Sequence, residues 1–332
     1  MSYDHDYPFI PAHHQLSLLI DLAEQYGVDH HLLLSGSGIF LQDILQGQKL
    51  ISYHQFQYIL TRANSLFKGE DLRFLFGERC LTTPFNDAFQ SMLYAKTLKD
   101  VFTRYIEFHA LICPWLIPRV MYSHEDMIIY WLNAQAPEKL HLVEMTMSAV
   151  KAMSRAIYQN KLEWTFEFNC QEPEYIEQYW THLGDNLKFN QPIHCMRLPL
   201  AYLSERLPQH ALTMSSVSYL KAQQSLHQQQ LTMSFLEQID QYIMQNIQHA
   251  VTLEQVATYF DISPATLKRR LKKHNTHFQA QLDQCRLHTA VILHRVHGFK
   301  TEQIAQHLAI SDLTNFKRAL KRWCGQSNML MV

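Results

Sequence analysis

Two segments of this 332-residue chain repeat one pattern: TLEQVATYFDISPATLKR at residues 252–269 and TEQIAQHLAISDLTNFKR at residues 301–318. Each copy predicts a short helix, a turn and a second helix. A small alanine in each first helix permits close helix packing, and an isoleucine fills each turn. These four residues are Ala257, Ala305, Ile262 and Ile310. The duplication predicts two helix-turn-helix units.

Capping and packing residues support both units. A threonine is expected to cap each first helix and a serine each second helix. The expected caps are Thr252 and Ser263 in the first copy, and Thr301 and Ser311 in the second. Pro264 follows Ser263 at the first helical position, which favours a helix start there. Apolar residues four positions apart anchor each second helix, namely Leu267 with Leu271 and Phe316 with Leu320.

The remaining faces of the two second helices are suited to DNA. The first has five Lys or Arg side chains within residues 268–273, and the second combines Thr314 and Asn315 with several cations. Arg and Lys can hydrogen-bond guanine edges and Asn can pair with adenine. Cations at the flanks neutralise phosphates. A basic face on one helix is often merely solvated, but two copies of the whole motif favour double-stranded DNA as the partner.

A single helix is expected to connect the two units. Residues 277–295 place Phe278, Leu282, Cys285, Thr289 and Ile292 on one face, over a length of about 28 Å at 1.5 Å per residue. One turn of B-DNA is about 34 Å. A rigid connecting helix of this length would therefore set two recognition helices into successive major grooves.

These residues resemble the AraC/XylS family of transcription regulators. The resemblance covers residues 234–327 and rests on the following pieces: residues 262–272 (ISPATLKRRLK), 286–290 (RLHTA), 303–305 (QIA) and 315–325 (NFKRALKRWCG). It implies an all-α DNA-binding domain with two helix-turn-helix units joined by a long helix. It also implies that the base-facing residues are Ala265, Lys268, Arg269, Leu313, Thr314, Asn315 and Arg318. Lys272 is expected to contact a phosphate.

The chain departs from the family pattern at three places. Asp261 and Ala309 stand where the family usually has a turn glycine, and a left-handed alanine costs about 1 kcal/mol. Leu313 replaces a commonly polar reader, so contact with a thymine methyl is expected there. The ending Gly325-Gln326-Ser327-Asn328 differs from the usual Gly-x-Ser-Pro.

The sequence of the first two thirds of the chain predicts an α+β domain. Residues 14–110 have helical apolar spacing, with a capping box at Thr97 and Asp100. A hairpin is expected from strands 120–122 and 127–132 around the turn 123–126. A helix at 140–158, a strand at 163–168, a helix after Pro173 and a strand at 193–197 are predicted to follow.

Scattered residues in this part resemble the arabinose-binding-like sensor domain found in one branch of the AraC/XylS family. They are Thr97-Leu98, Pro173, Tyr179, Leu183-Gly184, residues 189–192 (FNQP) and Leu198-Pro199. The resemblance implies a sensor for a small-molecule effector, without implying that the effector is a sugar. It assigns no effector-binding residue.

Composition agrees with two domains that have different partners. The net charge of −1 hides a charge of +5 on residues 230–332, which carry 12 Lys or Arg against 7 Asp or Glu, and −6 on residues 1–229. The expected domains are 1–208 for effector sensing or self-association and 234–332 for DNA binding. A linker is expected at 209–233, where a partial helix remains an alternative. The acidic start and the lack of a long apolar run predict a cytoplasmic protein with no membrane contact.

Other chemistries find little support. Twenty histidines invite a metal site, but Cys285 and His288 lack further ligands nearby in sequence, so no metal and no cofactor are predicted. Gly36-Ser37-Gly38 lacks the form of a nucleophile elbow, and no catalytic constellation is visible. Seven aromatic residues suit either a core or a ligand cavity: Trp115, Tyr122, Tyr130, Trp131, Trp164, Phe166 and Phe168.

Taken together, the sequence predicts a DNA-binding transcription regulator controlled by a small effector. RNA polymerase and a second copy of the chain are further candidate partners. Two alternatives remain open. In one, the N-terminal domain only oligomerises; in the other, it is an enzyme tethered to DNA.

Overall fold

The N-terminal third is helical, as the sequence predicts. The structure is a computed structural model that describes residues 3–83, 86–133, 140–229, 231 and 233–325. Its first helices are α1 (Ala12–Gln25), α2 (His30–Leu34), α3 (Leu41–Leu45), α4 (Tyr53–Leu66), α5 (Leu72–Cys80), α6 (Asp87–Leu93), α7 (Leu98–Glu107) and α8 (His109–Ile112). The capping box of α7 is confirmed, because Thr97 Oγ1 accepts from the Asp100 amide at 3.3 Å and Asp100 accepts from the Thr97 amide at 3.1 Å.

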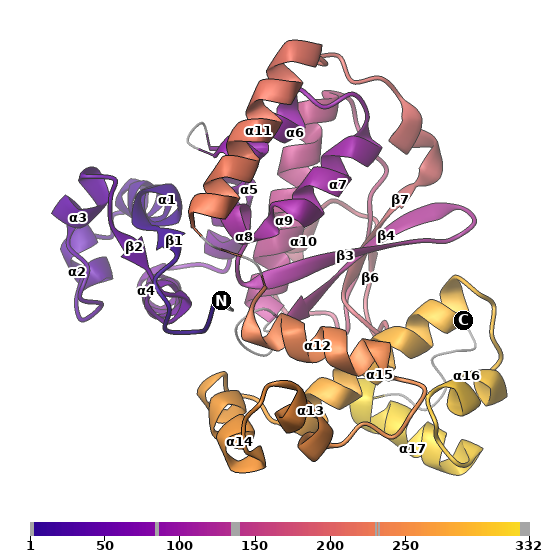
Figure 1. Ribbon diagram of the computed structural model, residues 1–332. Coiled ribbons are helices and arrows are strands. Elements are labelled where there is room, and N and C mark those ends of the chain that lie inside the picture. The colour runs from indigo at the N-terminus through magenta and orange to yellow at the C-terminus, as the bar shows by residue number, and fades with distance from the viewer. Residues whose placement is uncertain (1–2, 84–85, 134–139, 230, 232, 326–332) are drawn as a thin grey trace.

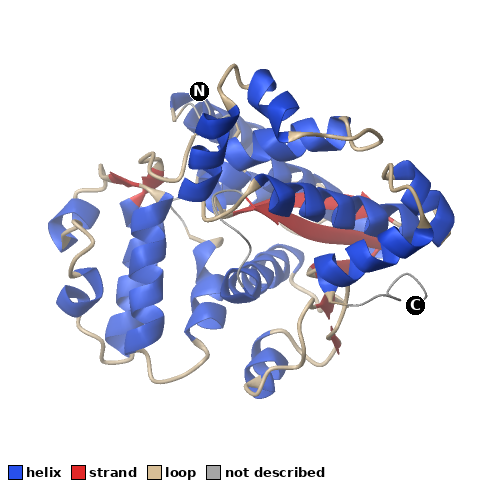
Figure 2. Cartoon of the chain, turned by 90° about the horizontal axis from the view of Figure 1, so that it is seen from below, coloured by secondary structure: helices blue, strands red, loops and turns tan. Residues whose placement is uncertain are grey.

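Most of the strands gather in one sheet, and β1 (Ile10–Pro11) and β2 (Leu50–Ile51) form a small pair apart from it (Figure 2). The five-stranded sheet has the order β3-β4-β7-β5-β6. Its strands are β3 (Leu116–Tyr122), β4 (Asp126–Asn133), β5 (Thr165–Glu167), β6 (Leu187–Lys188) and β7 (Cys195–Pro199). The predicted hairpin is confirmed as the antiparallel β3–β4 pair, with Tyr122 opposite Met127. β3 starts earlier than expected and includes Pro118, which an edge strand tolerates.

The elements predicted after the hairpin are also present, with small shifts. They are α9 (Leu140–Tyr158), β5, α10 (Ile176–His182) and β7, followed by the 3-10 helix η1 (Leu200–Ser204). The last strand lies at 195–199 rather than 193–197. The α+β class predicted for this part is therefore confirmed.

The two faces of the sheet belong to different cores. Met127, Ile129 and Trp131 of β4 face the large core shared with α5, α7 and α9. The alternate residues Ile128 and Tyr130 pack on the opposite side, against helices from the C-terminal part of the chain. Alternation along a strand sends neighbouring side chains to opposite faces. This explains why β4 is apolar along nearly its whole length.

The C-terminal part is all-helical, as predicted, and packs beneath the sheet (Figure 1). Its helices are α12 (Phe235–Gln245), α13 (Leu253–Tyr259), α14 (Pro264–Lys273), α15 (Phe278–Arg295), α16 (Thr301–His307) and α17 (Leu313–Cys324). The predicted connecting helix is observed as α15. The tail after Gly325, including the unusual ending noted above, lies outside the described residues. No helix among the described residues is long and apolar enough to cross a membrane.

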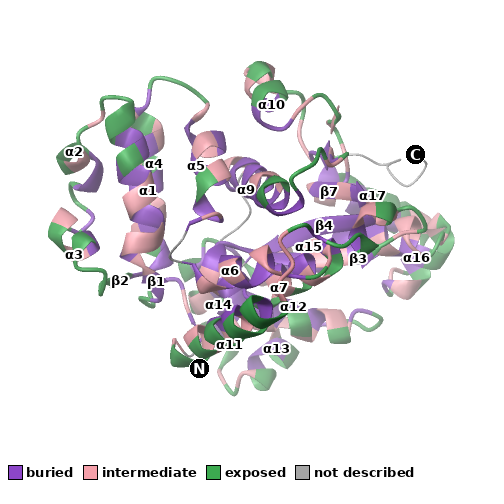
Figure 3. Ribbon diagram, turned by 90° about the horizontal axis from the view of Figure 1, so that it is seen from above, coloured by how far each residue is buried: buried purple, intermediate pink, exposed green. Residues whose placement is uncertain are grey.

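The stretch expected to be a linker contains a helix. α11 (Leu212–Gln228) packs on α6 and α8 through the buried small residues Ser215, Ser218 and Ala222. Much of its remaining surface is exposed (Figure 3). Small side chains at helical spacing produce little hydrophobic periodicity, so the sequence pattern did not reveal this packed helix.

Candidate nucleic-acid interface

Helix α14 presents its predicted DNA-facing residues to solvent. Ser263 caps the helix by accepting from the Thr266 amide at 3.1 Å, and Pro264 follows, as predicted. Leu267 and Leu271 are buried in the C-terminal core, which fixes the rotation of the helix. The opposite side exposes the four predicted residues, namely Ala265, Lys268, Arg269 and Lys272.

Helix α17 is presented in a similar way. Phe316 and Leu320 are buried, while Thr314, Asn315 and Arg318 are exposed. Leu313 is partly buried and packs against the C-terminal core, so it offers DNA less surface than its neighbours. The Asn315 amide group donates to Asp312 Oδ2 at 2.6 Å in this state. The side chain of Asn315 is thus bonded to the N-cap residue of its own helix.

Two of the four predicted caps are wrong. Lys300, not Thr301, occupies the N-cap of α16, and Asp312, not Ser311, caps α17 by accepting from the Asn315 amide at 2.8 Å. The left-handed turn residue precedes the cap by two positions in the first unit (Asp261) and by three in the second (Ala309). The second turn is therefore one residue longer, which shifts the following helix.

The two turn residues that stand in place of the usual glycine have the left-handed backbone conformation expected at those positions. Asp261 and Ala309 both have φ of +54°. Aspartate tolerates this region, whereas the Cβ of alanine crowds the backbone there. The second unit therefore contains a local strain that the first largely avoids.

Replacing Ala309 by glycine should relieve that strain. We expect Ala309→Gly to raise the free energy of unfolding by roughly 1 kcal/mol, measured by chemical denaturation of the full chain. Ala305→Gly is the matched control, because Ala305 lies within α16 and glycine in a helix interior destabilises by about 1 kcal/mol. Destabilisation by both substitutions would contradict the proposed strain.

The connecting helix α15 is buried on two sides. Leu282 and Cys285 point into the C-terminal core, while Leu287 and Val291 pack against the sheet. Cys285 Sγ donates to Asp240 Oδ1 at 3.0 Å, and burial raises the pKa of Asp240 despite this hydrogen bond. His288 contacts the Tyr130 ring, and burial lowers the pKa of His288 to about 4. α15 thus joins the two helix-turn-helix units and also touches the N-terminal sheet.

Sequence reasoning missed a contact between the N-terminus and α14. Asp4 pairs with Arg270 at 3.4 Å and with His274, and Asp6 pairs with Lys273 at 2.6 Å. Burial alone would raise the pKa of Asp4, but its bonds to His274 and the Arg270 charge lower it overall. The one sequence feature that pointed to this contact is the acidic start of the chain, whose charge is opposite to that of residues 268–273. Two cations of α14, Arg270 and Lys273, are therefore engaged in ion pairs with the N-terminal segment.

The predicted DNA-facing cations remain available. Within the described part of the chain, Lys268, Arg269, Lys272 and Arg318 are exposed and form no ion pair. Arg270 instead lies over the Phe235 ring, 3.8 Å from its centroid. Neighbouring arginines on α14 therefore have different surroundings, and only Arg269 faces outward.

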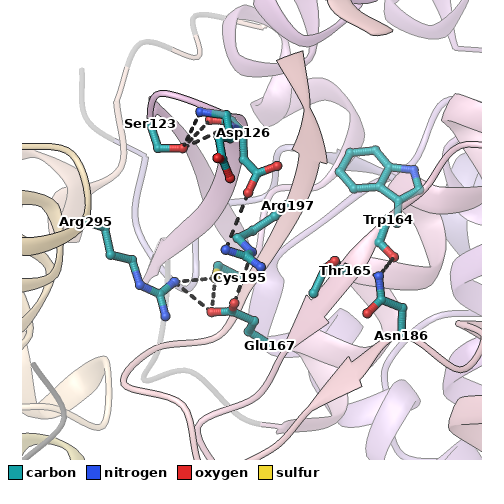
Figure 4. Close-up of polar contacts among 10 residues, drawn as sticks. Ser123, Asp126, Trp164, Thr165, Glu167, Asn186, Cys195, Arg197 and Arg295 are labelled. Atoms are coloured by element: carbon teal, nitrogen blue, oxygen red, sulfur yellow. Dashed lines mark hydrogen bonds and ion pairs between the residues drawn. The ribbon is translucent and has the colours of Figure 1, made fainter. Parts of the chain in front are cut away.

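A second set of ion pairs joins the sheet to α15 (Figure 4). Glu167 on β5 is 2% exposed and accepts from Arg295 of α15 at 2.7 Å. Its other oxygen lies 3.1 Å from Nε of Arg197, and Cys195 Sγ donates to Glu167 at 3.3 Å. Burial and the Glu167 carboxylate raise the pKa of the Cys195 thiol. The sequence separation of 128 residues between Glu167 and Arg295 hid this contact.

Most of the aromatic candidates are core residues. Trp115, Trp131, Phe166 and Phe168 are fully buried, whereas Tyr122 is exposed. Trp164 is also buried, but it lines a cavity of about 710 Å³ beside α9. Two residue groups bring possible metal ligands together: His5, Asp6 and His54, and Asp29, His30 and His31. In each group, at least one ligand is exposed, as is common on metal-free surfaces.

Comparison with known proteins places this architecture in a family. Residues 27–207, more than half of the chain, match the family described as "Arabinose-binding domain of AraC transcription regulator, N-term". The chain belongs to this family. The match includes helices α2 to α8 and the five-stranded sheet, so the assignment to the AraC-type family does not rest on the helix-turn-helix units.

Named relatives of this AraC-type chain are transcription regulators. The HTH-type transcriptional regulator VqsM of Pseudomonas aeruginosa is 28% identical over 150 residues, 44% of this chain and 43% of that protein. An uncharacterized HTH-type regulator of Mycobacterium bovis is 38% identical over 74 residues, 22% of each chain. The chain thus matches less than half of the length of each of these two relatives. The ornithine utilization regulator of P. aeruginosa is 20% identical over 93% of this chain and 92% of its own.

Proposed function

We propose that this AraC-type chain is a cytoplasmic, sequence-specific DNA-binding regulator of transcription whose activity a small effector modulates. The observation that carries the proposal is the pair of recognition helices α14 and α17, both exposed and both attached to the single helix α15. Its named relatives are regulators, which supports a role in regulation rather than in catalysis. The match of residues 27–207 to a ligand-binding domain family supports control by a small effector.

Genome-wide mapping of bound DNA tests the proposal. One chain with two recognition helices should select sites that span two successive major grooves on one side of the duplex. Binding to such a site should weaken steeply with salt, because exposed cations release counterions from phosphates. Uniform coverage of the genome without enriched sites would contradict sequence-specific binding.

The N-terminal contact with α14 is proposed to restrain DNA binding. Asp4 and Asp6 hold Arg270 and Lys273, which could otherwise meet phosphates. In the held state these ion pairs are formed, and in the released state they are broken. An effector that binds one state more tightly than the other would shift the equilibrium between them, and the DNA affinity with it, by the ratio of its two affinities. RNA polymerase is proposed as the partner that the bound regulator contacts.

Removing one of these carboxylates should increase DNA affinity. We expect Asp6→Asn to tighten binding about two- to fivefold, because the Lys273–Asp6 pair is exposed and such pairs contribute up to about 1 kcal/mol. Asp185→Asn is the matched control, since it removes the same charge from an exposed position away from α14. Fluorescence anisotropy with labelled DNA measures both. An equal gain for the two variants would indicate only a change in net charge.

Self-association is the second candidate role of the N-terminal part. α11 exposes Leu212, Val217 and Leu220, with exposed fractions of 75%, 46% and 55%. Exposed apolar residues on one helix favour contact with another copy of the chain. Sedimentation of the wild type and of a Leu220→Lys variant tests this role, and a monomeric wild type would rule it out.

A further inference from the structure

One of the two groups of possible metal ligands has a buried member. A ring nitrogen of His5, a ring nitrogen of His54 and a carboxylate oxygen of Asp6 lie within 4.8 Å of one another. His5 is only 4% exposed, whereas Asp6 and His54 are exposed. The other group, at residues 29–31, has no buried member. The first group therefore combines one fixed side chain with two that can turn toward it.

Backbone and ring contacts hold His5 beside the start of α4. The His54 amide donates to the His5 carbonyl oxygen at 3.3 Å, and the centroids of the two rings are 5.3 Å apart. The His5 ring also meets the Tyr53 ring edge-on, at 5.4 Å between centroids. Because the ligands come from two separate segments of the chain, sequence reasoning did not predict a metal here.

The spacing of the ligand atoms suits a small cation. Nδ1 of His5 lies 3.1 Å from Oδ1 of Asp6. Ligand atoms around a tetrahedral zinc ion are about 3.3 Å apart, because the bonds to the metal are about 2.0–2.1 Å long. These two atoms are therefore already close to the required spacing. Rotation of the exposed His54 side chain would complete the set.

The ring of His5 can offer a lone pair to such an ion. Its Nε2 is buried and has no hydrogen-bond partner among the residues that the structure describes. The hydrogen bond between Nδ1 and Asp6 is thus the one that orients the ring there. With Nε2 unpaired, no second partner fixes the position of the ring proton, and a nitrogen without the proton is a metal ligand.

Asp6 connects this group to helix α14. Its Oδ1 faces His5, while its Oδ2 pairs with Nζ of Lys273 at 2.6 Å. A divalent ion on the carboxylate would neutralise the charge that attracts Lys273 and would also repel the ammonium group. Both effects weaken the pair between Asp6 and Lys273.

We propose that His5, Asp6 and His54 bind a divalent transition-metal ion of the zinc class, and that this ion competes with Lys273 for Asp6. Imidazole ligands select zinc and its neighbours over magnesium and calcium. Three protein ligands leave a fourth tetrahedral position for water. The bound ion releases Lys273 toward phosphates and so tightens DNA binding; this effect, unlike the site itself, rests on the proposed function.

Calorimetry of the full chain, first freed of metal with a chelator, tests the site. The probe is zinc chloride, with magnesium chloride as the control ion, for which we expect no measurable binding. His54→Gln and Asp6→Asn each remove an exposed ligand and should weaken zinc binding at least about tenfold, because even an outer partner of a metal site contributes about 10- to 100-fold.

His31→Gln is the matched control, since it removes an exposed histidine from the other group. We expect it to leave the zinc affinity unchanged. Absence of zinc binding, binding that both His54→Gln and Asp6→Asn retain, or an equal loss in His31→Gln overturns the site.

Fluorescence anisotropy with labelled DNA, with and without zinc, tests the competition. Zinc should tighten DNA binding by the wild type about two- to fivefold, as expected for loss of an exposed ion pair. It should have no effect on His54→Gln, which lacks the site, or on Asp6→Asn, which lacks the pair as well. If zinc binds through His54 and the DNA affinity of the wild type does not change, the competition with Lys273 is wrong. If sequence-specific DNA binding is absent with and without zinc, the proposed function fails, whereas calorimetry still decides the site.

Discussion

Replacing Arg318 by alanine is expected to weaken binding to the preferred DNA site by about 1–3 kcal/mol and to relax selection at one base position. Arg318 is exposed on α17, and the buried residues Phe316 and Leu320 fix the side of the helix from which it projects. An arginine that donates two hydrogen bonds to guanine accounts for a loss of this size. Arg269→Ala on α14 should behave in the same way at another position of the site.

Two other positions on α14 are controls for this prediction. Lys272→Ala should weaken binding to all sequences and reduce the salt slope by about one, as expected for a phosphate contact. Arg270→Ala should leave base preference unchanged, because the Arg270 side chain lies over Phe235 and pairs with Asp4. Selection from a random DNA library distinguishes these cases. An unchanged preferred site for both Arg318→Ala and Arg269→Ala would show that the assigned DNA-facing sides are wrong.

The second large effect is expected at Gly77, where α5 crosses α9. A Cβ at this position would lie 2.2 Å from the Met145 carbonyl oxygen and 3.0 Å from Ser148 Cβ. Both helices are in the core, so the backbone of α9 would have to move. We expect Gly77→Ala to destabilise the protein by about 3 kcal/mol or more. That corresponds to a fall of roughly 6–12 °C in melting temperature.

Gly69→Ala is the matched control for Gly77→Ala. Its Cβ would meet Asp71 Oδ1 at 2.9 Å, but this carboxylate ends a flexible side chain that can turn away. We therefore expect a change in stability within about 0.5 kcal/mol. Similar melting temperatures for Gly77→Ala and the wild type would show that α5 and α9 are not packed as closely as described.

Local sequence patterns were enough to predict the C-terminal helix-turn-helix part of the chain. Leu267, Leu271, Phe316 and Leu320 repeat at helical spacing, and side chains four residues apart share one face of a helix. Those anchors determine which residues remain outside, so the exposed sides of α14 and α17 followed from spacing alone. The wrong cap of α17 arose because the second turn is one residue longer. The wrong cap of α16 has another cause: Lys300 lies five residues before Ala305, as Thr252 lies five before Ala257, so Thr301 is already the first residue of its helix.

Contacts between distant residues could not be predicted in this way. Asp4 and Arg270 are separated by 266 positions, and nothing in the residues around either one indicates the other. The packing of α11 depends on small side chains that leave no clear period. Likewise, Gly77 appears as an ordinary glycine until the approach of α9 shows why a side chain does not fit there.

By itself, the sequence determined the two helix-turn-helix units, the connecting helix and the α+β class of the N-terminal part, because periodicity, caps and turns act over a few residues. The tertiary structure decided that α15 packs on the sheet, that Glu167 meets Arg295, and that a polar cavity forms between them. Those features require side chains from separate elements to be brought together. Only the folded chain sets their distances and burial.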